Sequence, residues 1–192
     1  MTSQTNINRE TKETAIKLTL NIDGRQQGNI DTGLPFLDHM LMQLVVHGGW
    51  DLTIQASGDI DVDDHHLVED IAIALGQALE REWRQKNAFK RYGQRLLPMD
   101  ATLVMVAVDV SGRPYCVCDL PFTREFTGSI ASEMWPHFFY SLAINAKISL
   151  HIKSMYFDNN HHLIEAAFKG LAKSLGEALS HSDDENSSKG VL

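Results

Sequence analysis

The sequence predicts an α/β (α+β) protein built from two copies of one β-β-α-β-α unit, in which mixed sheets carry helices on one face. Three observations support this: a segment that recurs in the second half, apolar residues at helical spacing, and amphipathic runs that end in glycine turns. We place the halves at residues 9–95 and 96–180 of a single chain of 192 residues, followed by a C-terminal tail at 181–192.

An internal repeat relates residues 36–79 to residues 134–175. His39 falls on His137, and the strand-like sequence DLTI falls on SLHI. After a two-residue contraction in the loop, the sequence HHLVE falls on HHLIE, so both histidines and the glutamate recur. The chain therefore uses one structural unit twice.

In the first half we expect an amphipathic strand at 15–22, a helix at 35–46, a strand at 50–56 and a second helix. The first strand ends in the turn Asp23-Gly24 and precedes a further strand. Asp63 and Asp64 are good N-cap residues for the second helix. The apolar positions of that helix recur at helical spacing: Leu67, Ile71, Leu75 and Leu79.

The second half repeats this order. We expect a strand at 101–110 that ends in the turn Ser111-Gly112, a helix at 135–146 and a strand at 148–154. Asn159 and Asn160 are the N-cap candidates of the last helix.

Composition narrows the classes of function. Because 17 basic and 25 acidic residues give a net charge of −8, a duplex nucleic-acid partner is disfavoured. The first ten residues contain no apolar signal region, and no apolar run is long enough to cross a bilayer. Cys116 and Cys118 lie two residues apart on an expected strand, where they cannot easily form a disulfide. We therefore expect a soluble cytoplasmic protein without a membrane partner.

The repeated histidines and glutamates predict metal ligands. On a helix, His65 and Glu69 lie one turn apart on one face, and His66 lies nearly as close to Glu69. His161, His162 and Glu165 repeat this geometry. Adjacent histidines point about 100° apart around a helix, so they are not expected to serve one ion together.

With His39 and His137, the repeated set contains six histidines and two glutamates, or three histidines and one glutamate per ion. Such a set leaves coordination positions open for water or substrate, as catalytic sites do. The ligands fit Mn, Fe, Co or Zn better than Ca or Mg. Asp38, Asp64 and Asp70 could orient the imidazoles. The histidines without repeat partners are expected to be ordinary surface or hydrogen-bonded residues: His47, His151 and His181.

Other interpretations remain open at this point. A single His-His-x-x-Glu pattern is more often a surface patch than a metal site, and the duplication is what favours metal. The ligand set would also suit a dinuclear hydrolase of phosphate esters or a non-catalytic metal-storage shell. No glycine-rich loop of the kind that binds nucleotide phosphates is present.

Six strings together resemble the imidazoleglycerol-phosphate dehydratase family: LPFLDHML, DDHHLVEDIAIALG, SGRPY, HFFYSLA, NNHHLIEAAFKGLAKSL and SSKGVL. The similarity extends from Arg9 to the last residue. It implies a dehydratase that converts imidazole glycerol phosphate to imidazole acetol phosphate in histidine biosynthesis. It also implies two manganese ions and a homo-oligomeric, 24-subunit shell with active sites at subunit interfaces.

The resemblance also assigns residues. Its metal ligands fall on the eight repeated residues: His39, His65, His66, Glu69, His137, His161, His162 and Glu165. Its substrate-binding residues fall on Glu13, Gln43, Arg91, Arg113, Lys169, Ser188 and Lys189, of which the basic ones and Ser188 bind the phosphate. The tail, which composition alone would leave as a solvated terminus, is then expected to close over the substrate. Ala101 departs from the family, which usually has an acidic residue there.

The implied mechanism is that two metal ions stabilise the substrate's imidazolate as Lewis acids, which acidifies the neighbouring carbon. Three carboxylates are the catalytic candidates: Glu13, Glu69 and Glu165. We expect Glu13 to transfer the proton, because a carboxylate outside the metal shell is free to titrate.

Overall fold

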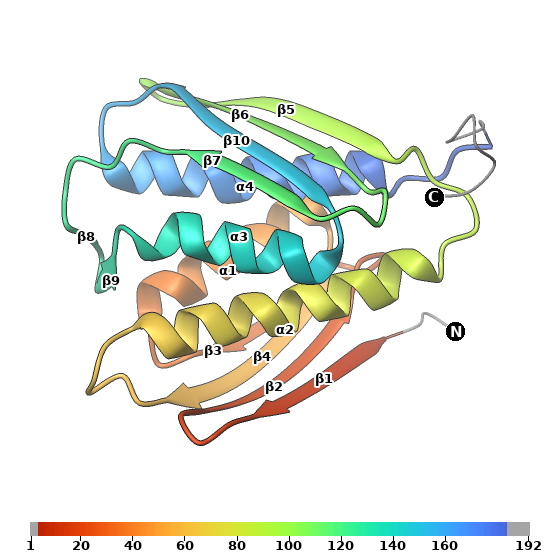
Figure 1. The fold of residues 1–192 in the computed structure, drawn as a ribbon. Coiled ribbons are helices and arrows are strands. Elements are labelled where there is room, and N and C mark those ends of the chain that lie inside the picture. The colour runs from red at the N-terminus through yellow and green to blue at the C-terminus, as the bar shows by residue number, and fades with distance from the viewer. Residues whose placement is uncertain (1–3, 184–192) are drawn as a thin grey trace.

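A computed structural model describes residues 4–183, which form two four-stranded sheets and four helices (Figure 1). The first sheet has the order β1-β2-β4-β3. Its strands are β1 (Thr5–Glu10), β2 (Thr14–Asn21), β3 (Gly28–Asp31) and β4 (Asp51–Gly58). The second sheet has the order β5-β6-β10-β7. Its strands are β5 (Tyr92–Met99), β6 (Thr102–Asp109), β7 (Tyr115–Asp119) and β10 (Ser149–Tyr156).

The helices are α1 (Pro35–Gly48), α2 (His65–Arg84), α3 (Met134–Ala146) and α4 (Asn160–Ala178). A short hairpin, β8 (Phe126–Thr127) and β9 (Ile130–Ala131), precedes α3. All four helices lie between the two sheets, so each sheet carries helices on one face, as predicted (Figure 1). Helix α2 packs against α3, and α1 packs against α4.

The two halves have the same topology, which confirms the predicted duplication. In each sheet three strands are antiparallel and one, β3 or β7, pairs in parallel with its neighbour. Each unit contains one strand more than predicted, namely the edge strands β1 and β5. The sequence of β1 is mostly polar, with Ile7 its one buried hydrophobic residue, and β5 contains Pro98. Edge strands need little apolar periodicity, so their sequences carry only a weak strand signal.

The core lies between the sheets, where inward strand residues meet the helices. Along β2, Ile16, Leu18 and Leu20 are buried, and their neighbours Ala15 and Lys17 are exposed. The second half adds an aromatic cluster of Trp135, Phe138, Phe139 and Phe168, all fully buried.

The starts of α2 and α4 differ in how they are capped. Asn159 caps α4 as predicted, because its side chain accepts a hydrogen bond from the backbone N–H of His162 at 2.8 Å. The prediction was wrong for Asp64, whose carboxylate makes no cap. Its Oδ2 instead accepts from the backbone N–H of Ala131 at 2.8 Å and ties the β8–β9 hairpin to α2. Asp63 accepts from the backbone N–H of His65 at 2.9 Å.

Two further expectations concern the cysteines and membranes. Cys116 and Cys118 are free thiols. Burial raises the pKa of Cys116 to about 11 and, with a smaller contribution from Cys116 and Asp119, the pKa of Cys118 to about 12. Among residues 4–183, no helix has both the length and the apolar character needed to cross a bilayer.

Candidate metal centres

Two groups of candidate ligands form where helices of different halves meet. Cluster A consists of His65 and Glu69 from α2 and His137 from α3. Cluster B consists of His39 from α1 with His161 and Glu165 from α4. Within each cluster the ligand atoms all lie within 4.8 Å of one another. Each cluster therefore takes ligands from both halves of the chain.

Cluster A is open to solvent. The Nε2 atom of His137 lies 3.0 Å from Glu69 Oε1, and the Nε2 atom of His65 lies 3.9 Å from Glu69 Oε2. The two imidazole rings are 5.0 Å apart. Because the Glu69 side chain is 33% exposed, water has access to this carboxylate.

In cluster B the carboxylate is more buried, and both histidines are exposed. His161 and His39 approach the same oxygen, Glu165 Oε2, at 2.8 Å and 3.4 Å. The other oxygen, Oε1, forms an ion pair with Lys169 Nζ at 2.7 Å. Burial raises the pKa of Glu165, but hydrogen bonds from Lys169 and His161 outweigh it, so the net shift is downward.

An aromatic wall supports cluster B. The ring of Phe36 meets His161 edge-on at 5.3 Å and His39 at 6.4 Å. Gly128, with φ of 64°, forms the turn of the β8–β9 hairpin against Phe36, and a Cβ at this position would lie 2.6 Å from that side chain. The hairpin therefore fixes the position of Phe36 and, through it, the imidazoles.

His66 and His162 do not join the cluster of their own helix. The Nδ1 atom of His66 lies 3.0 Å from Asp59, and the Nδ1 atom of His162 lies 3.1 Å from Asp158. A hydrogen bond to Asp59 is the main reason that the pKa of His66 is raised. A carboxylate on Nδ1 orients the ring and leaves Nε2 as the metal-binding atom. The described residues thus bring three candidate ligands together in each cluster and leave His66 and His162 outside, with Nε2 of His162 3.8 Å from Asp100 Oδ2.

The three aspartates that we expected to orient imidazoles have other partners. Asp38 accepts hydrogen bonds from Thr32, Asp64 from Ala131, and Asp70 from Arg9 and Thr14. That interpretation was therefore wrong. The structure gives the orienting role to Asp59 and Asp158, which stand at different spacings from their histidines and so left no repeated signal.

Two predicted substrate-binding residues of the first half, Glu13 and Gln43, lie near candidate ligands, and Glu13 is the exposed one. It lies on the β1–β2 turn, with its Oε2 3.8 Å from His66 Nδ1, and its side chain is 54% exposed. Its backbone N–H donates to Thr11 Oγ1 at 3.1 Å. Gln43, by contrast, is buried and donates to the backbone oxygen of His39 at 2.9 Å.

Two of the predicted phosphate ligands lie at the other end of α4. The backbone N–H of Arg91 donates to the oxygen of Ala178, the last residue of this helix. A rise of 1.5 Å per residue places Ala178 about 20 Å from Glu165 along the helix. Both Arg91 and Arg113 pair with Asp109, at 2.7 Å and 3.8 Å. The metal clusters and these arginines are therefore separated within one chain.

Ser188 and Lys189 lie outside the described residues, so the predicted tail contacts carry no structural description.

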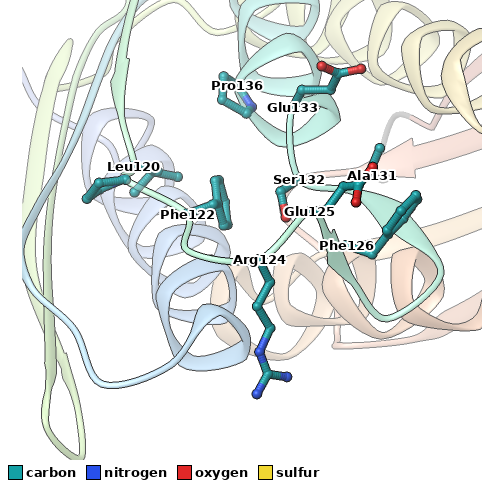
Figure 2. Close-up of a pocket in the computed structure, with 10 residues that line it drawn as sticks. Leu120, Phe122, Arg124, Glu125, Phe126, Ala131, Ser132, Glu133 and Pro136 are labelled. Carbon is teal, nitrogen blue, oxygen red and sulfur yellow. The ribbon is translucent and has the colours of Figure 1, made fainter.

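Two cavities border the hairpin. Figure 2 shows the one of about 590 Å³, lined by Leu120, Phe122 and Pro136 among others, with Arg124 projecting away from the apolar side chains. A second cavity of about 280 Å³ lies beside His161 and is also lined by Arg124. Sequence reasoning missed this arginine, which belongs to no repeated motif.

The chain matches a family and several of its members. The family model described as imidazoleglycerol-phosphate dehydratase matches residues 32–175. A protein of that name from Acetivibrio thermocellus is 44% identical over 189 residues, which cover 97% of each chain. A histidine biosynthesis bifunctional protein HisB from Legionella pneumophila is 48% identical over 187 residues, which cover 97% of this chain and 53% of that one.

Solved structures show the same fold. The crystal structure of imidazoleglycerol-phosphate dehydratase from Staphylococcus aureus has a TM-score of 0.86 and 37% identity, covering 94% of this chain and 100% of that one. The enzyme from Pyrococcus furiosus, in complex with (S)-C348, has a TM-score of 0.85 and 38% identity, covering 97% and 100%. These matches confirm the predicted fold class.

Proposed function

Because the chain belongs to the imidazoleglycerol-phosphate dehydratase family of hydro-lyases, we propose that it converts imidazole glycerol phosphate to imidazole acetol phosphate and water with a pair of divalent metal ions. The observation that carries this proposal is the pair of His-His-Glu clusters. The family and the names of the relatives place the chain in histidine biosynthesis. The substrate, the metals and the steps below are parts of the proposal.

The ligand atoms fit two divalent cations. Each cluster offers two imidazole nitrogens and one carboxylate, all within 4.8 Å. Borderline donors of this kind suit Mn, Fe, Co or Zn, and manganese is the metal that we propose. When bound, the two ions would act as Lewis acids that stabilise negative charge on the substrate's imidazole ring.

We further propose that a second copy of the chain completes each site. His66 and His162 lie outside the clusters of their own helices, and the carboxylate beside each Nδ1 leaves Nε2 for a bond to another group; Nε2 of His162 lies 3.8 Å from Asp100 Oδ2. Arg91 and Arg113 lie near the far end of α4, where they could reach only the metal cluster of another copy. Together these positions support an active site at a subunit interface, as in the proposed 24-subunit shell.

The outer face of the second sheet supports assembly as well. Six apolar side chains of this sheet are more than two-fifths exposed: Tyr92, Leu96, Tyr115, Val117, Met155 and Tyr156. The matching face of the first sheet is polar, with Asn6, Lys17 and Gln55 exposed. Exposed apolar patches of this kind mark protein–protein interfaces.

Different residues of the chain would transfer the proton, bind the metals and bind the phosphate. Glu13, which lies beside His66 and is exposed, would take or give the proton at the carbon next to the imidazole. Glu69 and Glu165 would hold the metals. Lys169, Arg91, Arg113, Ser188 and Lys189 would bind the phosphate and position the reacting carbon. The two halves would act as one unit, with residues 181–192 closing over the substrate, and the protein would work in the cytoplasm.

Turnover of imidazole glycerol phosphate by chelator-stripped protein, before and after addition of manganese, tests the proposal. We expect activity to disappear on stripping and to return with Mn²⁺ but not with Ca²⁺. If metal binds stoichiometrically and no turnover follows, the chain is a metal-storage protein or acts on another substrate such as a phosphate ester.

The role of Glu13 has its own test. Glu13→Gln should lower turnover about 100-fold or more and leave metal binding intact, because the amide cannot transfer the proton. Glu10→Gln, at an exposed position on β1, is the matched control. Full turnover by the Glu13 variant would show that another group moves the proton.

A further inference from the structure

We propose that clusters A and B bind metal unequally, because Lys169 weakens the affinity of cluster B for a divalent cation and the protein therefore fills cluster A first. This inference rests on the proposed function in one respect, which is that both clusters bind metal. The inference concerns which cluster binds a divalent cation first and how tightly each cluster binds it, which the ligand set alone does not determine.

The internal repeat isolates the difference between the clusters. Glu69 on α2 and Glu165 on α4 are equivalent positions that each follow a histidine pair. One helical turn later, α2 carries Ile73 and α4 carries Lys169. The two clusters thus share two imidazoles and one carboxylate, and Lys169 adds a positive charge to one of them.

The ammonium group is held close to the metal-binding carboxylate. Lys169 Nζ lies 2.7 Å from Glu165 Oε1, and the two side chains are only 20% and 9% exposed. The other contact of the ammonium group is the Met99 sulfur at 3.9 Å, which carries no charge to offset it. A cation on Oε2 would therefore share its carboxylate with a poorly solvated positive charge.

This charge has two effects on a bound cation. The ammonium group takes up a lone pair of Oε1, which disfavours binding of the metal through both oxygens of Glu165. It also repels the divalent ion across a few ångströms in a partly buried site, where electrostatic interactions are stronger than in bulk water. At cluster A, Glu69 is 33% exposed, and the residue one helical turn later is Ile73, which carries no charge. Both effects lower the affinity of cluster B relative to cluster A.

The same ion pair links the metal to the substrate. An anionic phosphate at Lys169 would offset the positive charge of the ammonium group and relieve its repulsion of the metal. Metal binding at cluster B would then be stronger when substrate is present. Lys169 would couple the two ligands, because it contacts Glu165 and is predicted to contact the phosphate.

Titration of Mn²⁺ into the chelator-stripped full-length protein, by calorimetry and by electron paramagnetic resonance of free Mn²⁺, tests the inference. We expect two binding classes whose affinities differ at least tenfold. Lys169→Met should raise the affinity of the weaker class about 10- to 100-fold, because it removes the repulsion and keeps the length of the side chain. Lys173→Met, one turn further along α4 at an exposed position, changes the net charge equally and should leave both classes unchanged.

Two reciprocal variants assign the classes. Glu165→Gln should abolish the weaker class, and Ile73→Lys should weaken the tighter one. Lys169→Gln repeats the test should the methionine variant fold poorly. Two equal classes in the unaltered protein, or an unchanged weaker class in both Lys169 variants, would overturn the inference. Absence of stoichiometric Mn²⁺ binding would instead overturn the proposed function.

Discussion

Asp70→Ala tests how the metal-bearing helix holds the turn that carries Glu13. Asp70 lies on α2 immediately after Glu69, and its side chain is 9% exposed. Its two oxygens accept hydrogen bonds from Arg9 at 2.7 Å and from Thr14 at 2.5 Å. Since Thr14 follows Glu13 directly, this carboxylate ties the β1–β2 turn to the helix.

The magnitude follows from these two contacts. A hydrogen bond to a charged group contributes about 1.5–3 kcal/mol, and leaving a fully buried charge without its partner costs about 3–5 kcal/mol. The Arg9 side chain is 31% exposed, so water can partly replace the lost carboxylate. We expect Asp70→Ala to lower the free energy of unfolding by about 2–4 kcal/mol.

Urea unfolding of the metal-free protein at a fixed protein concentration measures the change, with Asp31→Ala at an exposed position of β3 as the control. The control should change stability by less than about 0.5 kcal/mol. In folded Asp70→Ala, turnover should fall because Glu13 is no longer held, whereas Mn²⁺ binding at cluster A should persist. A loss of stability under about 1 kcal/mol, or unaltered turnover, would refute the reasoning.

Four further outcomes are expected from the structure. Gly93→Ala should destabilise the protein by about 3 kcal/mol or more in urea unfolding, because its Cβ would lie 2.0 Å from a backbone oxygen of α4. Gly176→Ala, where a Cβ has space on the same helix, should instead stabilise it by up to about 1 kcal/mol. Iodoacetamide at pH 8 should leave Cys116 and Cys118 largely unmodified until urea is added, since pKa values of about 11 and 12 make the thiolate scarce. Metal should dissociate as the pH falls, measured by dialysis, because protons compete for the imidazoles. Any bond from His66 to a metal of another copy should be lost at a higher pH than a bond from an unperturbed imidazole, because a hydrogen bond to Asp59 raises the pKa of His66.

The internal repeat is why much of the fold was predictable. Helical spacing and the matched histidines placed all four helices, and the strands between them followed from short apolar runs flanked by turns. The edge strands β1 and β5 were not predicted, because an edge strand needs few apolar residues. The repeat also could not reveal the β8–β9 hairpin, which has no counterpart in the first half.

The contacts around the candidate site were less predictable than its residues. The repeat had already identified the histidines and glutamates of both clusters as candidate ligands. Their spacing could not show that α2 packs against α3 and that α4 packs against α1. Long-range partners of carboxylates were the main error. Asp64 accepts a hydrogen bond from a backbone amide of β9 and Asp70 accepts one from Arg9, partners that lie far away in the sequence.

The crossing of ligands between halves has a consequence for the ancestry of the fold. A chain containing only one half would hold a histidine from its first helix and a His-His-Glu set from its second, but neither of the two clusters. Two such half-length chains placed symmetrically would complete both, so an ancestral homodimer could bind metal where its monomer could not. The two halves expressed as separate polypeptides, divided between Arg84 and Tyr92, should accordingly reassociate more tightly when metal is present.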